Sequence, residues 1–224
     1  GSWNNLIKIW NPNDGSLIKT LTGSSSSVES LAILPNGYLA SGTWDSSIKI
    51  WNPENGSLIK NLTGHTDYVL SLAVLPNGYL ASGSRDKSIN IWNTEDGSLI
   101  RTLTDHTFWV RCLAVLPNGY LASGSGDYTI KIWNLEEGSL MLTLTGHTCI
   151  VYSLAVLPNG YLASGSGDLT IKIWNPSDGS LIQTLTGHTS AVTSLAVLSN
   201  GYLASGSYLD IKIWKTNDGS FIQY

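Results

Sequence analysis

The chain has 224 residues, of which 42% are hydrophobic and 12% are charged, with a formal net charge of −4 at pH 7. This composition supports a sizeable core, and scattered Lys and Arg without a basic run argue against a nucleic-acid surface. No apolar run approaches the roughly 18 residues of a membrane span and the N-terminus lacks signal-peptide features, so we expect a cytoplasmic protein that binds neither nucleic acid nor membrane.

An internal repeat dominates the sequence. The segment Leu72–Ser84 recurs letter for letter at Leu113–Ser125 and at Leu154–Ser166. The dipeptide Ile-Trp marks each unit, with its tryptophan at Trp10, Trp51, Trp92, Trp133, Trp174 and Trp214, a spacing of 41 residues four times and then 40. A period of about 40–45 residues is typical of four-stranded propeller blades.

The first unit is incomplete. Residues 1–4 align with residues 42–45, so residues 3–22 provide only the third and fourth strands of a blade. We therefore expect a single propeller over residues 1–224, with a half-blade at 1–23 and five repeats at 24–64, 65–105, 106–146, 147–187 and 188–224.

One complete unit shows how the strands are arranged. The pattern predicts strands over 69–75, 79–84, 88–92 and 98–103, with turns between them and no room for a helix. Asn77-Gly78 predicts a hairpin, because both residues accept a positive φ. The fold class is therefore all-β, a β-propeller of four-stranded antiparallel blades, because blades packed around an axis bury both faces of each sheet.

The unit resembles the WD-repeat β-propeller family through Gly64-His65, Ser82, Asp86 and Trp92. In that family these side-chain types form a buried structural network of hydrogen bonds, which is stable only when every member is satisfied. The resemblance implies this role for His65, Ser82, Asp86, Trp92, His106, Ser123, Asp127, Trp133, His147, Ser164, Asp168, Trp174 and His188.

The chain departs from the family pattern at several positions. The usual Trp-Asp dipeptide is Trp-Asn in most units, as in Trp92-Asn93. Ser24 stands where histidine belongs, so the first full blade should have an incomplete network. The last turn between the second and third strands is one residue shorter, which places Asp210 out of alignment, and we expect this turn to be the weakest.

The half-blade leaves three alternatives open. Residues 3–22 could pair with strand 202–207 and displace the C-terminal hairpin, residues 211–224. They could instead be exchanged between chains, since swapping identical elements is an easy route to oligomers. The third alternative is that the sequence is a piece of a longer propeller.

No motif in the sequence indicates catalysis. Ser, His and Asp recur at one fold position in each typical unit, whereas a catalytic triad is a single site defined by its geometry. The four histidines lie one per blade, without metal-ligand spacing. Cys112 and Cys149 lack a CxxC motif and are expected to be reduced thiols. We therefore expect a non-catalytic protein without metal or cofactor.

Differences between the copies fall in a few columns. These columns lie in the connections between blades and in the turns between second and third strands, which share one rim of the propeller, called here the top rim. The turns between first and second strands and between third and fourth strands form the bottom rim. The candidate partner-binding residues are Glu29, Trp44, Tyr68, Leu70, Arg85, Trp109, Arg111, Ile150, Tyr152 and Tyr208.

The content of these columns suggests a function. Aromatic residues and arginine dominate interface hot spots, and in the resembling family this face commonly binds peptides and proteins. The first hypothesis is an interaction scaffold that binds a peptide or protein on its top rim. The alternative is a structural propeller, with repeats recently amplified or designed, that self-assembles through its half-blade. A glycan-binding propeller, suggested by the exposed Trp and Tyr side chains, is a third hypothesis.

Overall fold

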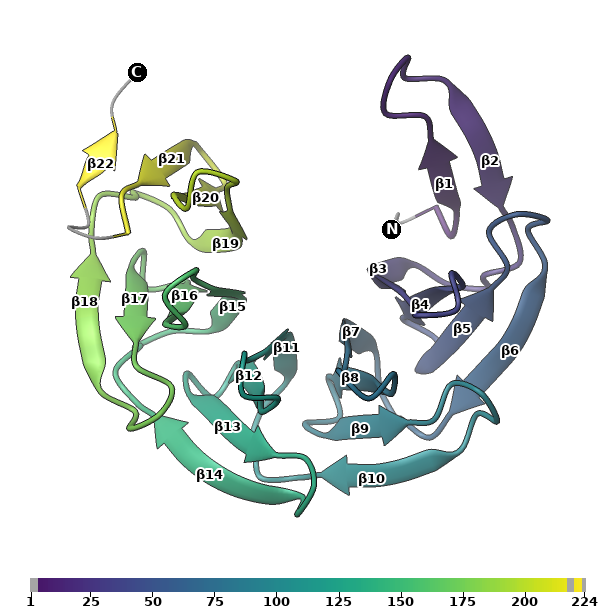
Figure 1. The fold of residues 1–224 in the computed structure, drawn as a ribbon, viewed down its shortest axis with the longest axis horizontal. Helices are drawn as coiled ribbons and strands as arrows, with labels where there is room; N and C mark the ends of the chain where they lie inside the picture. The colour runs from purple at the N-terminus through teal and green to yellow at the C-terminus, as the bar shows by residue number, and fades with distance from the viewer. Residues whose placement is uncertain (1–3, 217–219, 223–224) are drawn as a thin grey trace. The chain divides into compact units, whose positions relative to one another are not determined.

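The structure, a computed structural model, describes residues 4–216 and 220–222. Residues 1–3 of the predicted half-blade and residues 217–219 and 223–224 of the last repeat lie outside the described residues. The chain divides into two compact units, Gly1–Thr104 (unit 1) and Asp105–Tyr224 (unit 2), each built from antiparallel sheets (Figure 1).

Unit 1 contains one two-stranded and two four-stranded sheets. The strands of the small sheet are β1 (Ile7–Trp10) and β2 (Leu17–Leu21). The next sheet has the order β3 (Val28–Ile33), β4 (Leu39–Thr43), β5 (Ser47–Trp51) and β6 (Leu58–Thr63). The third has the order β7 (Val69–Val74), β8 (Leu80–Ser84), β9 (Ile89–Trp92) and β10 (Leu99–Leu103).

Unit 2 contains three four-stranded sheets in sequence order. Their strands are β11 (Val110–Val115), β12 (Leu121–Ser125), β13 (Ile130–Asn134) and β14 (Ser139–Leu144); β15 (Val151–Val156), β16 (Leu162–Ser166), β17 (Ile171–Trp174) and β18 (Leu181–Leu185); and β19 (Val192–Val197), β20 (Leu203–Ser207), β21 (Ile211–Trp214) and β22 (Phe221–Ile222). The predicted fold class of repeated four-stranded antiparallel blades is confirmed, and the strands predicted in the unit of β7–β10 agree within one residue at each end.

The hairpin predicted at Asn77-Gly78 is confirmed, because β7 and β8 pair antiparallel on either side of this turn. In the Pro76-Asn77-Gly78 turn only Gly78 has a positive φ, 84°. This three-residue loop therefore places the left-handed conformation on its last residue, rather than on both Asn and Gly. Of the three alternatives for the half-blade, displacement of strand 211–214 is not the arrangement found. β20 pairs with β21 from Leu203↔Trp214 to Gly206↔Ile211, while β1 pairs with β2.

Neighbouring sheets within each unit pack face to face. In unit 1, Ile48 and Leu62 of one sheet are buried against Val69 and Trp92 of the next. The same interface recurs in unit 2, where Ile171 packs in one cluster with Trp214. Figure 1 shows the first strands β3 and β7 side by side, and likewise β11, β15 and β19. Repeated identical residues thus mark the surfaces that one sheet presents to the next.

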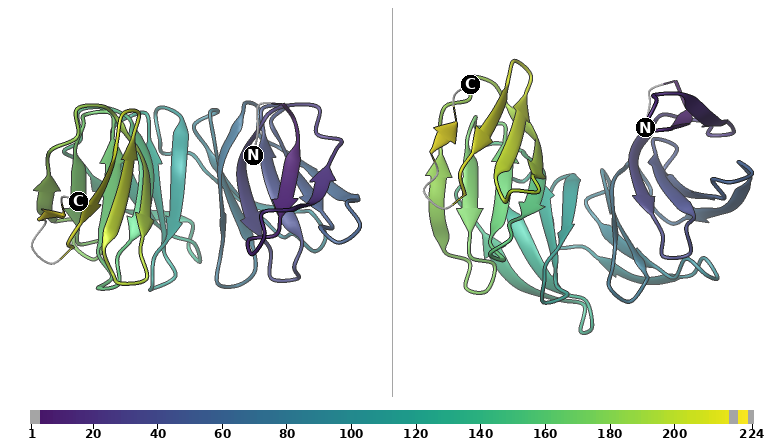
Figure 2. Two further views of the ribbon diagram at one scale, coloured as in Figure 1. Left: turned by 90° about the horizontal axis from the view of Figure 1, so that it is seen from above. Right: turned by 45° about the horizontal axis from the view of Figure 1, so that its top comes forward.

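Strand direction places the turns of each unit at two edges. Figure 2 shows the strands of each unit running between these edges. At one edge, backbone hydrogen bonds join Arg85 N–H to Tyr68 C=O and Trp44 N–H to Ser27 C=O, so the connections between sheets lie beside the turns between second and third strands. This edge is the predicted top rim.

Among the residues that the structure describes, no helix has the length and apolar character of a membrane span.

Candidate interaction surface

A buried hydrogen-bonded network lies beneath the top rim. His65 Nδ1 is 2.8 Å from Asp86 Oδ2, and His65 Nε2 is 2.7 Å from Ser82 Oγ. Ser82 Oγ also accepts a hydrogen bond of 2.8 Å from Trp92 Nε1. The Asp86 carboxylate in turn accepts from the backbone N–H of Thr66 and of Ser88. The network therefore ties a connection between sheets to strands β8 and β9.

The same geometry is found in the sheets of unit 2. Three further sets consist of His106, Asp127, Ser123 and Trp133; of His147, Asp168, Ser164 and Trp174; and of His188, Asp210, Ser205 and Trp214. No buried side-chain nitrogen or oxygen lacks a hydrogen-bond partner among the described residues. Full satisfaction is what makes a buried polar network stabilising.

Asp210 is a correction to the sequence analysis. Although alignment places it out of register, its Oδ1 lies 2.6 Å from His188 Nδ1. The physical reason is the shorter turn, in which Ser207 N–H donates to the C=O of Asp210 itself. This pairing brings the Asp210 carboxylate to the histidine and to Ser207 Oγ, also at 2.6 Å. Asp210 therefore belongs to the network of His188, a role that sequence reasoning missed.

The first full blade has the incomplete network that its sequence predicts. Trp51 Nε1 still donates to Ser41 Oγ over 2.8 Å, but Ser24 Oγ donates to the C=O of Ser26 instead of reaching Ser41. A buried lysine supports the carboxylate here, with Lys49 Nζ 2.7 Å from Asp45 Oδ2. Burial alone would raise the pKa of Asp45, but hydrogen bonds from Lys49 and neighbouring hydroxyls hold it well below its ordinary value.

The Ser–His–Asp sets resemble catalytic triads in geometry but cannot act on a substrate. Ser82, Ser123 and Ser164 are fully buried, and each hydroxyl oxygen already accepts a tryptophan N–H. Burial favours the neutral ring and lowers the pKa of His147. Burial opposes ionisation of Asp168, yet hydrogen bonds from Thr170 and His147 lower its pKa to about 2. The sets therefore hold strands together.

On the top rim of unit 1, four side chains form an ordered row, called here the aromatic row. The rings of Trp44 and Tyr68 stack with centroids 4.8 Å apart and an interplanar angle of 3°. Trp44 Nε1 donates to Glu29 Oε2 over 3.3 Å, and the Arg85 guanidinium lies 5.2 Å from the Tyr68 ring centroid. The structure thus brings together Glu29, Trp44, Tyr68 and Arg85 from neighbouring sheets.

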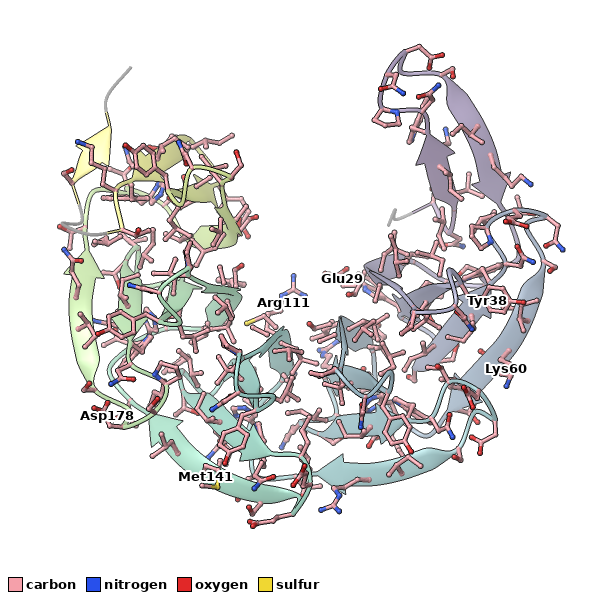
Figure 3. The ribbon with its side chains drawn as sticks, viewed as in Figure 1. Glu29, Tyr38, Lys60, Arg111, Met141 and Asp178 are labelled. Carbon is pink, nitrogen blue, oxygen red and sulfur yellow. The ribbon has the colours of Figure 1, made fainter. Side chains whose placement is uncertain are left out.

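All four members of the aromatic row are half-buried, and so is Leu70 on β7. Figure 3 shows Glu29 at the first strand of its sheet, whereas Lys60 lies on the last strand. The Arg85 Nε is also 3.7 Å from Asp67 Oδ2. The stacked rings of this row can contact an apolar side chain of a partner, while Glu29 and Arg85 can form ion pairs with the partner's charged groups.

Unit 2 presents different residues at the equivalent positions. Trp109 stacks on Phe108 with centroids 4.8 Å apart. Burial raises the pKa of the Tyr152 hydroxyl, and neighbouring Tyr208 raises it further, while Arg111 opposes the shift. Tyr208 is 72% exposed, whereas Trp109, Arg111, Ile150 and Tyr152 are half-buried.

Variation on the top rim is coupled between neighbouring positions. Where unit 1 has Trp44 or Arg85, the first two sheets of unit 2 have Gly126 and Gly167, and the third has Tyr208. A Cβ on Gly126 would lie 2.3 Å from Phe108 Cδ1. A Cβ on Gly167 would lie 2.7 Å from Cys149 Sγ. Phe108 and Cys149 fill these spaces and were missed by sequence reasoning. The signal was present, because the column holding Ser26, Asp67, Phe108, Cys149 and Ser190 also varies.

No group of three or more His, Cys, Asp or Glu side chains in the described part of the chain could hold a metal ion. Both thiols are free, and burial raises the pKa of Cys112 to about 12. A thiol with so high a pKa is a poor nucleophile near neutral pH, because the thiolate is the reactive form.

Comparison with known proteins identifies the repeat. The family model described as "WD domain, G-beta repeat" matches residues 15–52, 56–93, 97–134, 138–175 and 179–215. Each match covers the last strand of one sheet and the first three strands of the next, as β2–β5 illustrate. The chain matches no curated protein.

Proposed function

The chain belongs to the WD-repeat family, whose repeats generally mediate protein–protein interactions and are typically non-catalytic, and we propose that it binds a peptide or protein segment through its top rim. The observation that carries the proposal is the aromatic row of unit 1. Trp44 and Tyr68 are held parallel by stacking, with Glu29 bonded to one ring and Arg85 over the other.

This arrangement suits binding for two physical reasons. Tryptophan, tyrosine and arginine carry a disproportionate share of binding energy at protein interfaces. Side chains already fixed by stacking and hydrogen bonding lose little further freedom when a partner binds, which lowers the entropic cost of association. Trp109, Arg111, Ile150, Tyr152 and Tyr208 form the corresponding candidate surface in unit 2.

The experiment uses peptides selected from a random display library on the wild-type chain. Their dissociation constants are then measured for Trp44→Ala and Tyr152→Ala, with Tyr128→Asn as a control. Tyr128 is an exposed tyrosine on the same rim of unit 2 that is outside the proposed set, and asparagine tolerates its positive φ of 71°.

A hot-spot side chain costs more than about 1 kcal/mol when truncated, and often 2 kcal/mol or more. We therefore expect affinity to fall at least about tenfold in Trp44→Ala or Tyr152→Ala and to stay within about twofold in the control. Unchanged affinity in both alanine variants, with circular dichroism showing an intact fold, would show that the top rim is not the binding surface.

A second candidate function, self-assembly, is favoured by two exposed positions. Ile211 is 77% exposed, whereas its counterparts Ile48, Ile89, Ile130 and Ile171 are fully buried. Trp10 is 52% exposed, whereas the other five repeat tryptophans are no more than 2% exposed. Wherever neighbouring sheets pack within a unit, the isoleucine face of one sheet covers the tryptophan face of the next.

The exposed faces of β21 and β1 are therefore complementary, and we propose that they join two copies of the chain. Light scattering across a range of concentrations should show a defined multiple of 24.1 kDa. Ile211→Lys should return the chain to the monomer mass, whereas Ile33→Lys, at an equally exposed position (75%), should not. A monomer at all concentrations would contradict this candidate.

A further inference from the structure

A recessed pocket recurs on the bottom rim between each two neighbouring four-stranded sheets within one unit. The pocket in unit 1 is lined by Pro35, Asn36, Asn77, Gly78, Tyr79, Asn93, Thr94 and Glu95 and has a volume of about 430 Å³. The two in unit 2 have volumes of about 530 and 240 Å³. They are lined by Pro158, Asn159, Asn200, Gly201, Tyr202, Lys215 and Thr216, and by Leu116, Pro117, Asn118, Asn159, Gly160, Tyr161, Asn175, Pro176 and Ser177.

The three pockets share one construction. The first sheet supplies the Pro-Asn of its turn between first and second strands, as in Pro35-Asn36. The next sheet supplies the Asn-Gly-Tyr of the equivalent turn, residues 77–79 in unit 1. It also supplies the residues that follow its buried tryptophan, such as Asn93-Thr94. The chain therefore repeats a pocket as well as a packing surface.

The asparagines in these pockets are fixed by their own turns. Asn77 Oδ1 accepts the N–H of Tyr79 over 3.1 Å, and Asn93 Oδ1 accepts the N–H of Glu95 over 2.9 Å. Each carbonyl oxygen thus has a partner, while no hydrogen bond joins either Nδ2 group to another atom of the described residues. An amide Nδ2 is a donor of two hydrogen bonds. In unit 2, Asn159 and Asn200 are fixed in the same way, whereas Asn175 Nδ2 donates to Asp178 Oδ2 over 3.0 Å. Each pocket therefore holds the amide group of its turn asparagine in a fixed position.

The lining is nearly uncharged. Glu95 is the one ionisable acid in the unit 1 pocket and Lys215 the one cation in the larger pocket of unit 2, and the smallest pocket has neither. Asn93 and Asn175 stand where the family usually has aspartate, which removes a negative charge at each position. Tyrosine and proline rings supply apolar surface beside the amides. Such a lining complements neutral molecules with many hydroxyl groups and apolar C–H faces.

We propose that each bottom-rim pocket binds one unit of a neutral saccharide. This role is separate from the top rim and does not depend on the proposed peptide binding. One chain carries at least three such pockets, so a surface or polymer that repeats the saccharide is bound more tightly than the free sugar, because later contacts become intramolecular.

The test compares asparagine-to-aspartate variants with equal charge changes. The pocket variant combines Asn77→Asp, Asn159→Asp and Asn200→Asp. Aspartate keeps the Oδ1 atom that accepts the N–H of Tyr79, Tyr161 or Tyr202, so the turns are retained, but it removes the Nδ2 donors. The control variant combines Asn11→Asp, Asn55→Asp and Asn61→Asp, three positions outside the pockets.

Binding is measured by saturation-transfer NMR with free glucose, galactose, mannose and N-acetylglucosamine, and on arrays that display neutral glycans at several densities. We expect the wild type and the control variant to bind, with apparent affinity rising with glycan density, and the pocket variant to lose at least tenfold. Absence of any neutral-glycan signal for the wild type, or equal binding by both variants, would overturn the proposal. Peptide binding by the pocket variant should remain at the wild-type level.

Discussion

Replacing Ser82 by alanine tests the view that the Ser–His–Asp sets stabilise the fold. Ser82 Oγ serves two buried groups, Trp92 Nε1 at 2.8 Å and His65 Nε2 at 2.7 Å. Alanine leaves both without a partner. Each unsatisfied buried group costs about 1–3 kcal/mol, so the variant should lose about 2–6 kcal/mol of the free energy of unfolding.

The first full blade of the same unit provides the matched variant. Ser41 Oγ accepts from Trp51 Nε1 but has no histidine partner, because Ser24 occupies that position. Ser41→Ala should therefore cost about 1–3 kcal/mol, smaller by one buried group. The assay is urea unfolding of both variants, followed by tryptophan fluorescence and by circular dichroism. If Ser82→Ala and Ser41→Ala lost the same free energy of unfolding, the claim that His65 depends on the Ser82 hydroxyl would be refuted.

Two further predictions concern packing and pH. Gly165→Ala places a Cβ 2.7 Å from Val192 Cγ1 and should lower the free energy of unfolding by about 1–3 kcal/mol. At the equivalent position, Gly206→Ala meets only a contact of 3.7 Å and should change this free energy by less than about 0.5 kcal/mol. Urea unfolding measures both variants. Because the pKa values of His147 and Asp168 are lowered in the folded chain, the unfolded chain binds more protons in acid. The free energy of unfolding should therefore fall below about pH 6.5 and again below about pH 4, and a constant value from pH 7 to pH 3 would contradict this.

The blades are predictable from the sequence because the same pattern of strand and turn residues recurs in every unit. Fixed spacing of Trp92 and its counterparts sets the register, and turn residues such as Gly78 set the strand boundaries. The histidine networks could be predicted in the same way. Asp210 could not, since alignment assumes turns of equal length, whereas the shorter turn closes on Asp210 itself and carries its carboxylate to His188.

The candidate surface was predictable as a set of columns but not as contacts. Variation alone does not show that Trp44 stacks on Tyr68 across two sheets or that Glu29 accepts from the indole. It also does not show that Gly126 varies together with Phe108, which depends on a distance between side chains. The bottom-rim pockets were hidden for the opposite reason, because their residues are nearly constant and their turns look like ordinary polar loops.

The most direct test of the proposed function is the affinity of library-selected peptides for the wild type and for Tyr68→Ala. Tyr68 lies at the centre of the aromatic row, between Trp44 and Arg85, so its removal disrupts both ring contacts at once. The account predicts at least a tenfold loss of affinity in a variant that remains folded. Peptides that bind Tyr68→Ala as tightly as the wild type, or a failure of the wild type to enrich any peptide, would contradict it.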